Sequence, residues 1–239
     1  MWPFSSKSAL EACGLFKGFT DWHSHILPGV DDGIPTQEEA FQVLERFEQL
    51  GFSTLWLTPH VMEDIPNTTE NLRQKFQDFT SAYNGTIKLH LAAEYMLDNG
   101  FEERLHNNDL LCIGVLNTKT LLVETSYFSP PMDLYGTLKR IRDKGYQPLL
   151  AHPERYLYMG SNDYERLKAM DVHFQCNVSS LTGAYGKEAS HKFFTFLAKG
   201  WIQALGTDTH MLNTFNQAIA RKCINGKQGT LLAGIPNVL

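Results

Sequence analysis

Short apolar runs alternate with segments of helical period along the chain. The first run, residues 19–23, alternates polar and apolar positions as a half-buried strand does. A helix follows it: Thr36 suits the N-cap, Glu39 stands three residues later as in a capping box, and Gly51 ends the apolar series. Further strand-like runs are predicted at residues 53–58, 88–93, 120–124, 147–151, 173–177 and 202–206.

Segments with a helical pattern separate these runs. They lie at residues 68–83, 132–144, 161–170, 186–199 and 213–224, with a shorter helix at 98–106 before an irregular stretch. Strands that recur roughly every 25–35 residues with helices between them favour repeated βα units closed into a barrel. An open doubly wound sheet is the alternative, but no Gly-rich nucleotide loop follows the first strand. We predict an N-terminal extension over residues 1–18 and one barrel domain over residues 19–239.

Residue types that bind metals follow almost every predicted strand. In a (β/α) barrel the carboxyl ends of the strands meet at one face, where active sites are assembled. Each residue taken alone has a structural explanation, such as a hydrogen-bonded histidine or a turn at Asp31-Asp32-Gly33. Together they predict a metal site made of His23, His25, Asp32, His60, Glu94, Glu124, His152, Asp208 and His210.

The chemistry of these ligands narrows the choice of metal. Imidazole and carboxylate ligands without thiolate suit Mn²⁺, Fe²⁺ or Zn²⁺ better than Ca²⁺ or Mg²⁺. Nine ligands are too many for one ion, whereas three divalent ions that share bridging carboxylates would use them. Three such ions outweigh the four carboxylates in charge, so the site would attract an anionic substrate. Multinuclear sites of this kind stabilise displacement at phosphorus and make hydroxide from water.

Composition excludes several other classes of function. The formal charge of −5 and the pI near 6.0 give no electrostatic footprint for nucleic acid. No apolar run approaches the roughly 18 residues that a membrane span needs, and the N-terminus does not read as a signal peptide. The four cysteines include no C-x-x-C pair, which favours reduced thiols and a cytoplasmic protein. They are Cys13, Cys112, Cys176 and Cys223.

Several segments resemble the motifs of the polymerase-and-histidinol-phosphatase (PHP) family. The segment 21–33, D-W-H-S-H-I-L-P-G-V-D-D-G, resembles its opening motif, and 151–156, A-H-P-E-R-Y, is equally specific. T-P-H at 58–60, A-E-Y at 93–95, V-E-T at 123–125 and G-T-D-T-H at 206–210 follow in the family's order. More narrowly, the chain resembles bacterial PHP-type protein tyrosine phosphatases of capsule and exopolysaccharide regulation, from about residue 19 to the C-terminus.

The resemblance implies a distorted (β/α)7 TIM-like barrel, the PHP fold, with three metal ions, manganese or iron most often and zinc as another option. His23, His25, Glu94 and Asp208 would hold one ion, Glu94, Glu124 and His152 a second, and Asp32, His60 and His210 the third. It implies a substrate protein that carries phosphotyrosine, for example the tail of a bacterial tyrosine kinase.

The resemblance also implies the residues that act on the substrate. Arg155 would contact the substrate phosphate. We assign catalytic roles to Arg155, Asp208 and His210, and substrate binding to Arg155, Tyr95 and Tyr156. Aromatic residues near the ligand loops could wall a slot for a phenyl ring; they are Tyr95, Tyr127, Phe128, Tyr156 and Tyr185.

One feature departs from the family pattern. Many members carry another arginine a few residues beyond the last motif, whereas residues 211–216 here contain none. The leading hypothesis is hydrolysis of protein phosphotyrosine by metal-activated hydroxide, and the C-x5-R signature of cysteine phosphatases is absent. The alternatives are a phosphatase for a small molecule, such as histidinol phosphate or a nucleotide monoester, and an inactive metal-binding regulatory protein.

Overall fold

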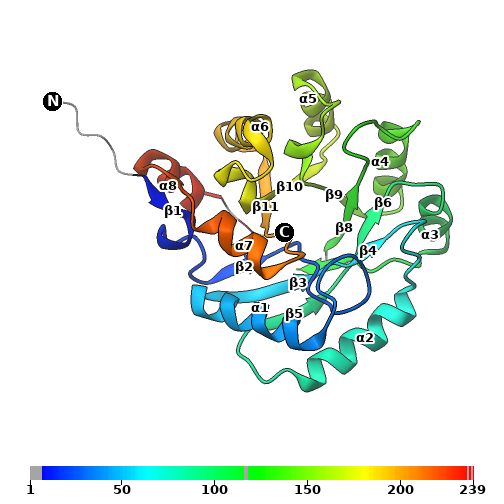
Figure 1. Ribbon diagram of the computed structural model, residues 1–239. Helices are drawn as coiled ribbons and strands as arrows, with labels where there is room; N and C mark the ends of the chain where they lie inside the picture. Colours follow the sequence, from blue (N-terminus) through cyan, green and yellow to red (C-terminus); the bar gives the residue numbers. More distant parts are fainter. Residues whose placement is uncertain (1–6, 116–117, 236, 238) are drawn as a thin grey trace.

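The computed structural model describes residues 7–115, 118–235, 237 and 239. Its centre is a ring of parallel strands surrounded by helices (Figure 1). The ring has seven strand positions, which we call staves. Two staves each consist of two consecutive strands separated by a short break: β3 with β4, and β5 with β6. The strands of the ring are β2 (Phe19–Asp21), β3 (Phe52–Leu57), β4 (His60–Val61), β5 (Lys88–Leu91), β6 (Glu94–Met96), β8 (Thr118–Glu124), β9 (Gln147–Ala151), β10 (His173–Asn177) and β11 (Ile202–Gly206).

Hydrogen bonds close the ring where its two sheets meet. One sheet has the order β2-β3-β5, and the other has the order β11-β10-β9-β8-β6-β4. At one junction the Trp22 N–H donates to Leu205 O over 3.2 Å. At the other, β3 continues into β4 and β5 into β6, and two bonds carry the pairing across the break: Ala92 N–H to Leu57 O over 2.9 Å and Glu94 N–H to Pro59 O over 3.1 Å. The predicted barrel with seven staves is confirmed, and the open sheet is not found.

A helix follows each stave and packs outside the ring (Figure 1). The first of them shows why the sequence pattern worked: Thr36 Oγ1 accepts the Glu39 N–H at 3.2 Å, and Gly51 ends the helix with φ 97°. The helices are α1 (Gln37–Leu50), α2 (Thr69–Ala82), α3 (Phe101–Asn107), α4 (Leu134–Asp143), α5 (Ser161–Ala169), α6 (Gly186–Lys199) and α7 (Leu212–Ile219).

Two apolar clusters fill the protein. Along β8 they alternate residue by residue: Leu122 belongs to a small cluster, whereas Leu121 and Val123 belong to the large one. Since neighbouring side chains on a strand point to opposite faces, the small cluster is the barrel interior. Trp22 and Trp56 stack in it with ring centroids 6.1 Å apart.

The segment predicted as an N-terminal extension contributes β1 (Ser8–Ala9), which pairs antiparallel with β12 (Lys222–Ile224). The prediction of helix over 213–224 is therefore wrong at its end: the chain leaves α7 at Ile219 and turns into β12, whose partner is distant in sequence. β7 (Ile113–Val115) occupies part of the predicted irregular stretch and pairs with β8, and α8 (Gly226–Ala233) follows β12. In the described ranges no helix is long and apolar enough to cross a membrane.

Candidate metal centre

The predicted ligands come together at the carboxyl ends of the staves. His23 and His25 follow β2, and Asp32 lies in the loop from there to α1. Of the other predicted ligands, His60 and Glu94 begin β4 and β6, just beyond the ends of β3 and β5, and Glu124 ends β8. His152 follows β9 directly, and Asp208 and His210 lie in the loop after β11. Most are buried, although Asp32 has a side chain that is 66% exposed. The parallel arrangement of the strands therefore places every predicted ligand in one group.

Glu94 is the centre of this group. Its Oε2 lies 3.0 Å from His23 Nε2 and 3.2 Å from both His25 Nε2 and His60 Nδ1. Its Oε1 lies 3.1 Å from His152 Nε2. Three imidazole nitrogens thus converge on one carboxylate oxygen, more than its two lone pairs can accept as hydrogen bonds. A cation between the nitrogens and the oxygen accounts for this crowding.

Glu124 and His60 provide a second indication of a cation. His60 Nδ1 and Glu124 Oε1 are only 3.1 Å apart, yet both atoms are buried without a hydrogen-bond partner. Such an unpaired buried carboxylate is costly unless something else neutralises it. Two ligand atoms of one ion have this relation, since both face the metal and not each other.

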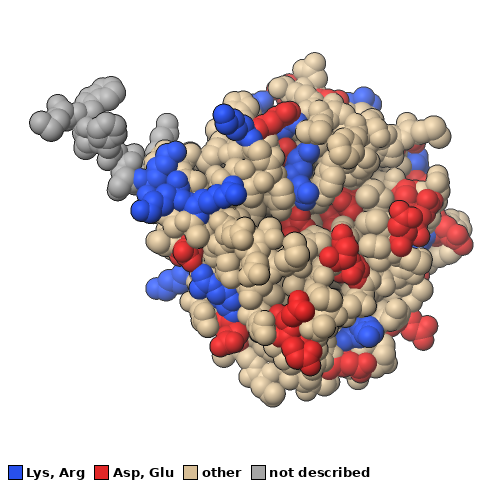
Figure 2. All heavy atoms as spheres, viewed as in Figure 1, with Lys and Arg blue, Asp and Glu red and all other residues tan. Residues whose placement is uncertain are grey.

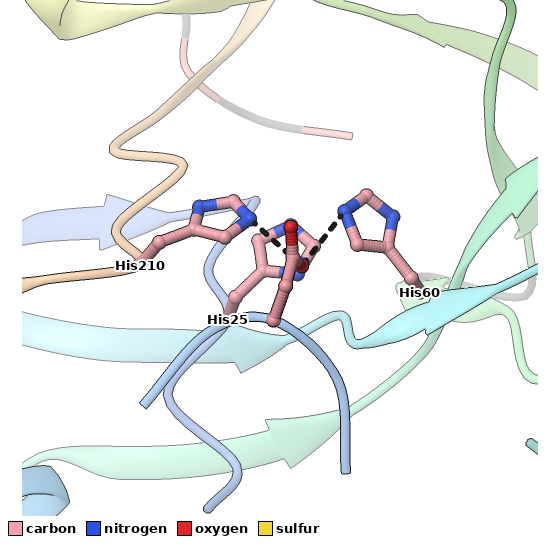
Figure 3. Close-up of side chains that lie close together, drawn as sticks. His25, His60 and His210 are labelled. Atoms are coloured by element: carbon pink, nitrogen blue, oxygen red, sulfur yellow. Dashed lines mark ion pairs between the residues drawn. The ribbon is translucent and has the colours of Figure 1, made fainter. Parts of the chain in front are cut away.

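Asp32 joins the histidines on the opposite side of the group. Figure 3 shows His60 and His210 approaching from either side with His25 between them, and the dashed lines mark the ion pairs with Asp32. Asp32 Oδ1 lies 3.6 Å from His60 Nε2 and 3.5 Å from His210 Nε2. The ligand atoms of His25, Asp32, His60 and His210 all lie within 4.8 Å of one another. Two other groups meet the same limit, namely His23 with His25 and Glu94, and His60 with Glu94 and Glu124.

The donor set therefore fits transition-metal ions. It contains imidazole and carboxylate only, the combination suited to Mn²⁺, Fe²⁺ and Zn²⁺. The three groups share His25, His60 and Glu94, as in a multinuclear centre.

A second layer of side chains orients the imidazoles, and sequence reasoning did not assign these residues. His25 Nδ1 lies 2.8 Å from Asp31 Oδ2, and His23 Nδ1 lies 2.7 Å from Gln175 Oε1. Such partners fix the tautomer and the ring orientation of a metal-binding histidine. Burial opposes ionisation of Asp31, but the hydrogen bond and charge of His25 outweigh it and lower the pKa of Asp31 to about 2. The i, i+2 and i+8 spacing of His23, His25 and Asp31 was the available signal.

The carboxylate of Asp21 joins two of the loops that carry predicted ligands. It is fully buried and accepts the Thr207 N–H at 2.8 Å, the Thr207 hydroxyl at 2.6 Å and the His23 N–H at 3.2 Å. Burial raises the pKa of Asp21 to about 7, and the hydrogen bonds and the charge of His23 offset that rise only in part. The carboxylate thereby joins the end of β2 to the loop that carries Asp208.

Without metal, the carboxylates attract protons onto the histidines. Burial lowers the pKa of His23, but the negative charges of Glu94 and Asp208 outweigh it and raise that pKa to about 9. The same competition raises the pKa of His60 to about 10 through Glu94 and Glu124. Burial would raise the pKa of Glu94, but the positive charges of His23 and His60 hold it well below its usual value. The site thus balances its negative charge with protons when no metal is bound.

Arg155 is held at the edge of the cluster. Its Nη1 donates to Asp208 Oδ2 over 2.8 Å, and the guanidinium lies between two aromatic rings, 4.3 Å from the centroid of Tyr127 and 4.2 Å from that of Tyr185. Asn177 donates to the same Asp208 oxygen over 2.7 Å. Contacts with the two rings and one charged hydrogen bond fix the orientation of the guanidinium.

The backbone at two predicted ligands takes an uncommon conformation. His152 has φ 34° and Asp208 has φ 52°, in the left-handed region that costs non-glycine residues roughly 1–2 kcal/mol. Strain of this kind gathers at functional sites, where the surroundings impose it. In both loops it turns a side chain towards Glu94 or the histidines around it.

A cavity of about 430 Å³ opens over the cluster. Its polar lining includes Arg155, Glu124 and His60, and its apolar walls are Tyr127, Tyr185, Met62, Met96, Met211 and Phe215. Figure 2 shows acidic side chains around the centre of the viewed face and basic ones at its edge near α8 and β1. The cavity has the size of a small-molecule site.

The assignment of Tyr95 and Tyr156 to substrate binding is wrong. Both are buried in the large apolar cluster, 1% and 0% exposed, and neither lines the cavity. Tyr95 accepts the Leu111 N–H at 2.7 Å, and Tyr156 donates to Ala151 O over 3.0 Å. Of the aromatic residues proposed for the slot, Tyr127 and Tyr185 line the cavity, and Phe128 lies outside it.

The fold and the site define the class of protein: an α/β barrel with a centre of histidine and carboxylate ligands at the carboxyl ends of its strands. A family model described as "Capsular polysaccharide synthesis, CpsB/CapC" matches residues 19–229, and the chain belongs to this family. The family resemblance in the sequence is thereby confirmed.

Individual relatives cover most of the chain. The tyrosine-protein phosphatase YwqE of Bacillus subtilis (strain 168) is 25% identical over 202 residues, 82% of this chain and 79% of that protein. The tyrosine-protein phosphatase CpsB of Streptococcus agalactiae is 28% identical over 207 residues, 81% of this chain and 83% of that protein. A crystal structure from work on YwqE from Bacillus subtilis and CpsB from Streptococcus pneumoniae, described as unique metal-dependent tyrosine phosphatases, has the same fold. It matches with a TM-score of 0.76 and 20% identity over 92% of this chain and 88% of that one.

Proposed function

We propose that this protein is a metal-dependent phosphatase that hydrolyses phosphotyrosine in proteins. The observation that carries the proposal is the fixed Arg155 guanidinium beside the histidine and carboxylate cluster in one cavity. Relatives that are 25% and 28% identical over about four-fifths of the chain are named tyrosine-protein phosphatases. The combination of a metal centre and a planar cation suits a phosphoryl group.

Three divalent ions, manganese or iron with zinc as another option, would occupy the centre. His23, His25, Glu94 and Asp208 would hold the first, and Glu94, Glu124 and His152 the second. Asp32, His60 and His210 would hold the third. When bound, the ions would supply Lewis acidity and an activated water for attack on phosphorus. The shared contacts of Glu94 with four imidazoles support its role as a bridge between ions.

The chain's own residues would bind and orient the substrate. Arg155 would clamp the phosphoryl group, and Asp208 would keep Arg155 in place while it also serves as a ligand. His210, whose side chain is 28% exposed, would act at the mouth of the cavity. Tyr127 and Tyr185 would flank the phenyl ring and take the role first given to Tyr95 and Tyr156. The guanidinium contact strengthens as charge develops on the phosphoryl oxygens.

The physiological substrate would be a cytoplasmic protein with accessible phosphotyrosine, such as the tail of a bacterial tyrosine kinase. Capsule synthesis, which the family description names, is the setting in which such a kinase would act. The four described cysteines are free, in keeping with a reducing compartment.

Comparative turnover tests this proposal. With added Mn²⁺, the protein should hydrolyse free phosphotyrosine and phosphotyrosine peptides and should turn over histidinol phosphate and nucleotide monoesters far more slowly. Preference for a small-molecule phosphate would replace the proposal with a small-molecule phosphatase. Absence of turnover with every substrate, in protein with a full metal complement, would indicate a regulatory protein.

A further inference from the structure

A second depression lies on the outer side of the Arg155 stack. Tyr127, Arg155 and Tyr185 line both this depression and the catalytic cavity, so the stack is a wall between the two. The rest of its apolar lining is Phe128, Leu157 and Ala189. We call it the flanking pocket. Its position next to the guanidinium makes it continuous with the site that would hold the phosphoryl group.

Two large apolar side chains stand exposed at the flanking pocket. Phe128 is 77% exposed and Leu157 is 59% exposed, whereas Ala189 from α6 is buried. Exposed apolar side chains that gather at a concave site mark an interaction surface more often than scattered ones do. Here they lie on two loops that meet at the mouth of the barrel.

The flanking pocket is built on connected loops. The Leu157 N–H donates to Tyr127 O over 2.9 Å, which joins the loop after β8 to the loop after β9. Lys192 from α6 donates to Tyr156 O over 2.6 Å. These bonds hold the backbone directly before Phe128 and at Leu157, so the apolar surface needs little ordering when a ligand binds.

The size and charge of the flanking pocket limit which ligands it can bind. The volume of about 210 Å³ is below that of ordinary small-molecule pockets and matches one large side chain. Glu188, with a side chain 64% exposed, lies at the edge of the pocket and pairs with Lys192 over 3.2 Å. An apolar ligand would cover Phe128 and Leu157, whereas an acidic one would leave them exposed and lie beside the Glu188 carboxylate.

We propose that the flanking pocket binds an apolar side chain of the substrate polypeptide close in sequence to the phosphotyrosine. The inference rests on the proposed phosphotyrosine phosphatase function and adds a sequence preference to it. The phosphoryl group would lie on one side of the Arg155 stack and the apolar side chain on the other. Phe128 and Leu157 would then determine specificity for the peptide without touching the reacting atoms.

Steady-state kinetics on designed peptides test the inference. Three phosphotyrosine peptides carry leucine, glycine or aspartate at the two positions on each side of the phosphotyrosine, and p-nitrophenyl phosphate reports on the chemistry alone. All assays use the full chain with added Mn²⁺. The leucine peptide should have a kcat/KM about tenfold above the glycine peptide, the effect expected of one apolar side chain in a pocket. The aspartate peptide should be the poorest, and the differences should lie mainly in KM.

Two variants and a matched control test whether the flanking pocket causes the preference for the leucine peptide. Phe128→Ser and Leu157→Ser should each remove most of the advantage of the leucine peptide and leave kcat/KM for p-nitrophenyl phosphate within about twofold. Met132→Ser is the control, because Met132 is fully exposed in the same loop as Phe128 but does not line the pocket. It should leave the preference for the leucine peptide unchanged.

The outcomes separate this inference from the proposed function. Turnover of all three peptides with no preference, or a preference that both serine variants retain, overturns the flanking pocket and leaves the phosphatase function standing. Equal loss in Met132→Ser also overturns it, since the effect would then come from the loop as a whole. Failure of metal-loaded wild-type protein on p-nitrophenyl phosphate and on every peptide overturns the proposed function, and this inference with it.

Discussion

Arg155 is fixed before any substrate arrives. Its guanidinium lies over the rings of Tyr127 and Tyr185, and Asp208 accepts one of its N–H groups at 2.8 Å. Burial opposes the charge on the guanidinium, but Asp208 outweighs that cost and raises the pKa of Arg155 above its ordinary value. A cation that is already oriented loses little entropy when it binds an anion, so it stabilises a transition state effectively.

Removal of this guanidinium tests its role. Arg155→Ala should lower kcat on a phosphotyrosine peptide by roughly 10²–10³-fold, or about 3–4 kcal/mol, by analogy with the loss of one oxyanion donor. KM should rise as well, because residues 211–216, directly beyond the last motif, contain no second arginine. Arg155→Lys should recover little, since an ammonium lacks the planar fork. Steady-state kinetics at fixed Mn²⁺ measure both values.

Metal content and folding of these variants serve as the control, because Arg155 is not among the ligand groups. If Arg155→Ala keeps more than about a third of the wild-type kcat/KM, corresponding to under about 1 kcal/mol, Arg155 is not the phosphate clamp.

Protonated histidines give a second prediction at this scale. The folded, metal-free protein holds protons on His23 and His60, whose pKa values are raised to about 9 and about 10. Since metal binds the neutral imidazole, Mn²⁺ added to metal-free protein at pH 7 should release roughly two protons. Titration calorimetry in two buffers of different ionisation enthalpy measures the number. Binding with no proton release would show that these imidazoles are already neutral.

The sequence predicted the candidate ligands but not the residues that support them. His23 and His25 could be recognised because their i, i+2 spacing on a strand turns both side chains to one face. Gln175 could not, because its contact with His23 joins residues that are 152 positions apart. Tyr156 was misassigned, because proximity in sequence to Arg155 says nothing about which way a ring points. Distances between loops, not residue types, decide such roles.

At the scale of elements, the seam between β2 and β11, where these two strands meet and close the ring, positions His23. A Cβ built on Gly206 would lie 2.5 Å from His23 Cβ and 2.7 Å from Gln175 Nε2, closer than real contacts allow. Gly206 is therefore the residue that lets β11 pass directly beside a ligand and its supporting amide. The requirement is steric, since Gly206 is not among the positive-φ glycines.

A methyl group at this seam should displace His23. Gly206→Ala should weaken metal binding by roughly 10–100-fold, the usual effect of disturbing a partner of a ligand, and should lower activity at limiting Mn²⁺. Activity as a function of free Mn²⁺ measures the shift. Gly160→Ala is the matched control, because its Cβ would meet only Asp163 Oδ2 at 3.9 Å. Equal Mn²⁺ dependence in both variants would contradict the steric argument.

Elements were predictable where local chemistry defines them. The helix capped by Thr36 and the strands 147–151, 173–177 and 202–206 lie where the pattern placed them. β12 was missed, because its strand conformation depends on pairing with β1, more than 200 residues earlier in the chain. β4 and β6 were missed for a related reason: each is a short continuation of a stave past a break, and a pattern of two or three residues carries no period.

At the scale of the whole molecule, the barrel gathers charged groups whose burial destabilises the fold, and bound metal ions would offset that destabilisation. Closure of the ring brings four carboxylates and five histidines together in one group, which is buried apart from Asp32 and part of His210. Buried charges of one sign destabilise a fold unless they are paired. The apolar clusters lie elsewhere, between the strands and helices and inside the barrel. They should keep the ring folded without metal, so metal binding adds stability to a fold that already exists.

Metal removal therefore has two measurable effects. Elemental analysis of purified protein should find two to three equivalents of transition metal, because three ligand groups share Glu94, His25 and His60. Chelation should abolish phosphatase activity and lower the midpoint of thermal unfolding by several degrees, since ions that bind only the folded state stabilise it by mass action. Added Mn²⁺ should restore both.

Circular dichroism should show the helices still folded at 25 °C in the metal-free sample, because neither apolar cluster contains a predicted ligand. Full activity in protein verified as metal-free would exclude the proposed chemistry, whereas loss of activity without any change in thermal stability would place the ions outside the buried group around Glu94.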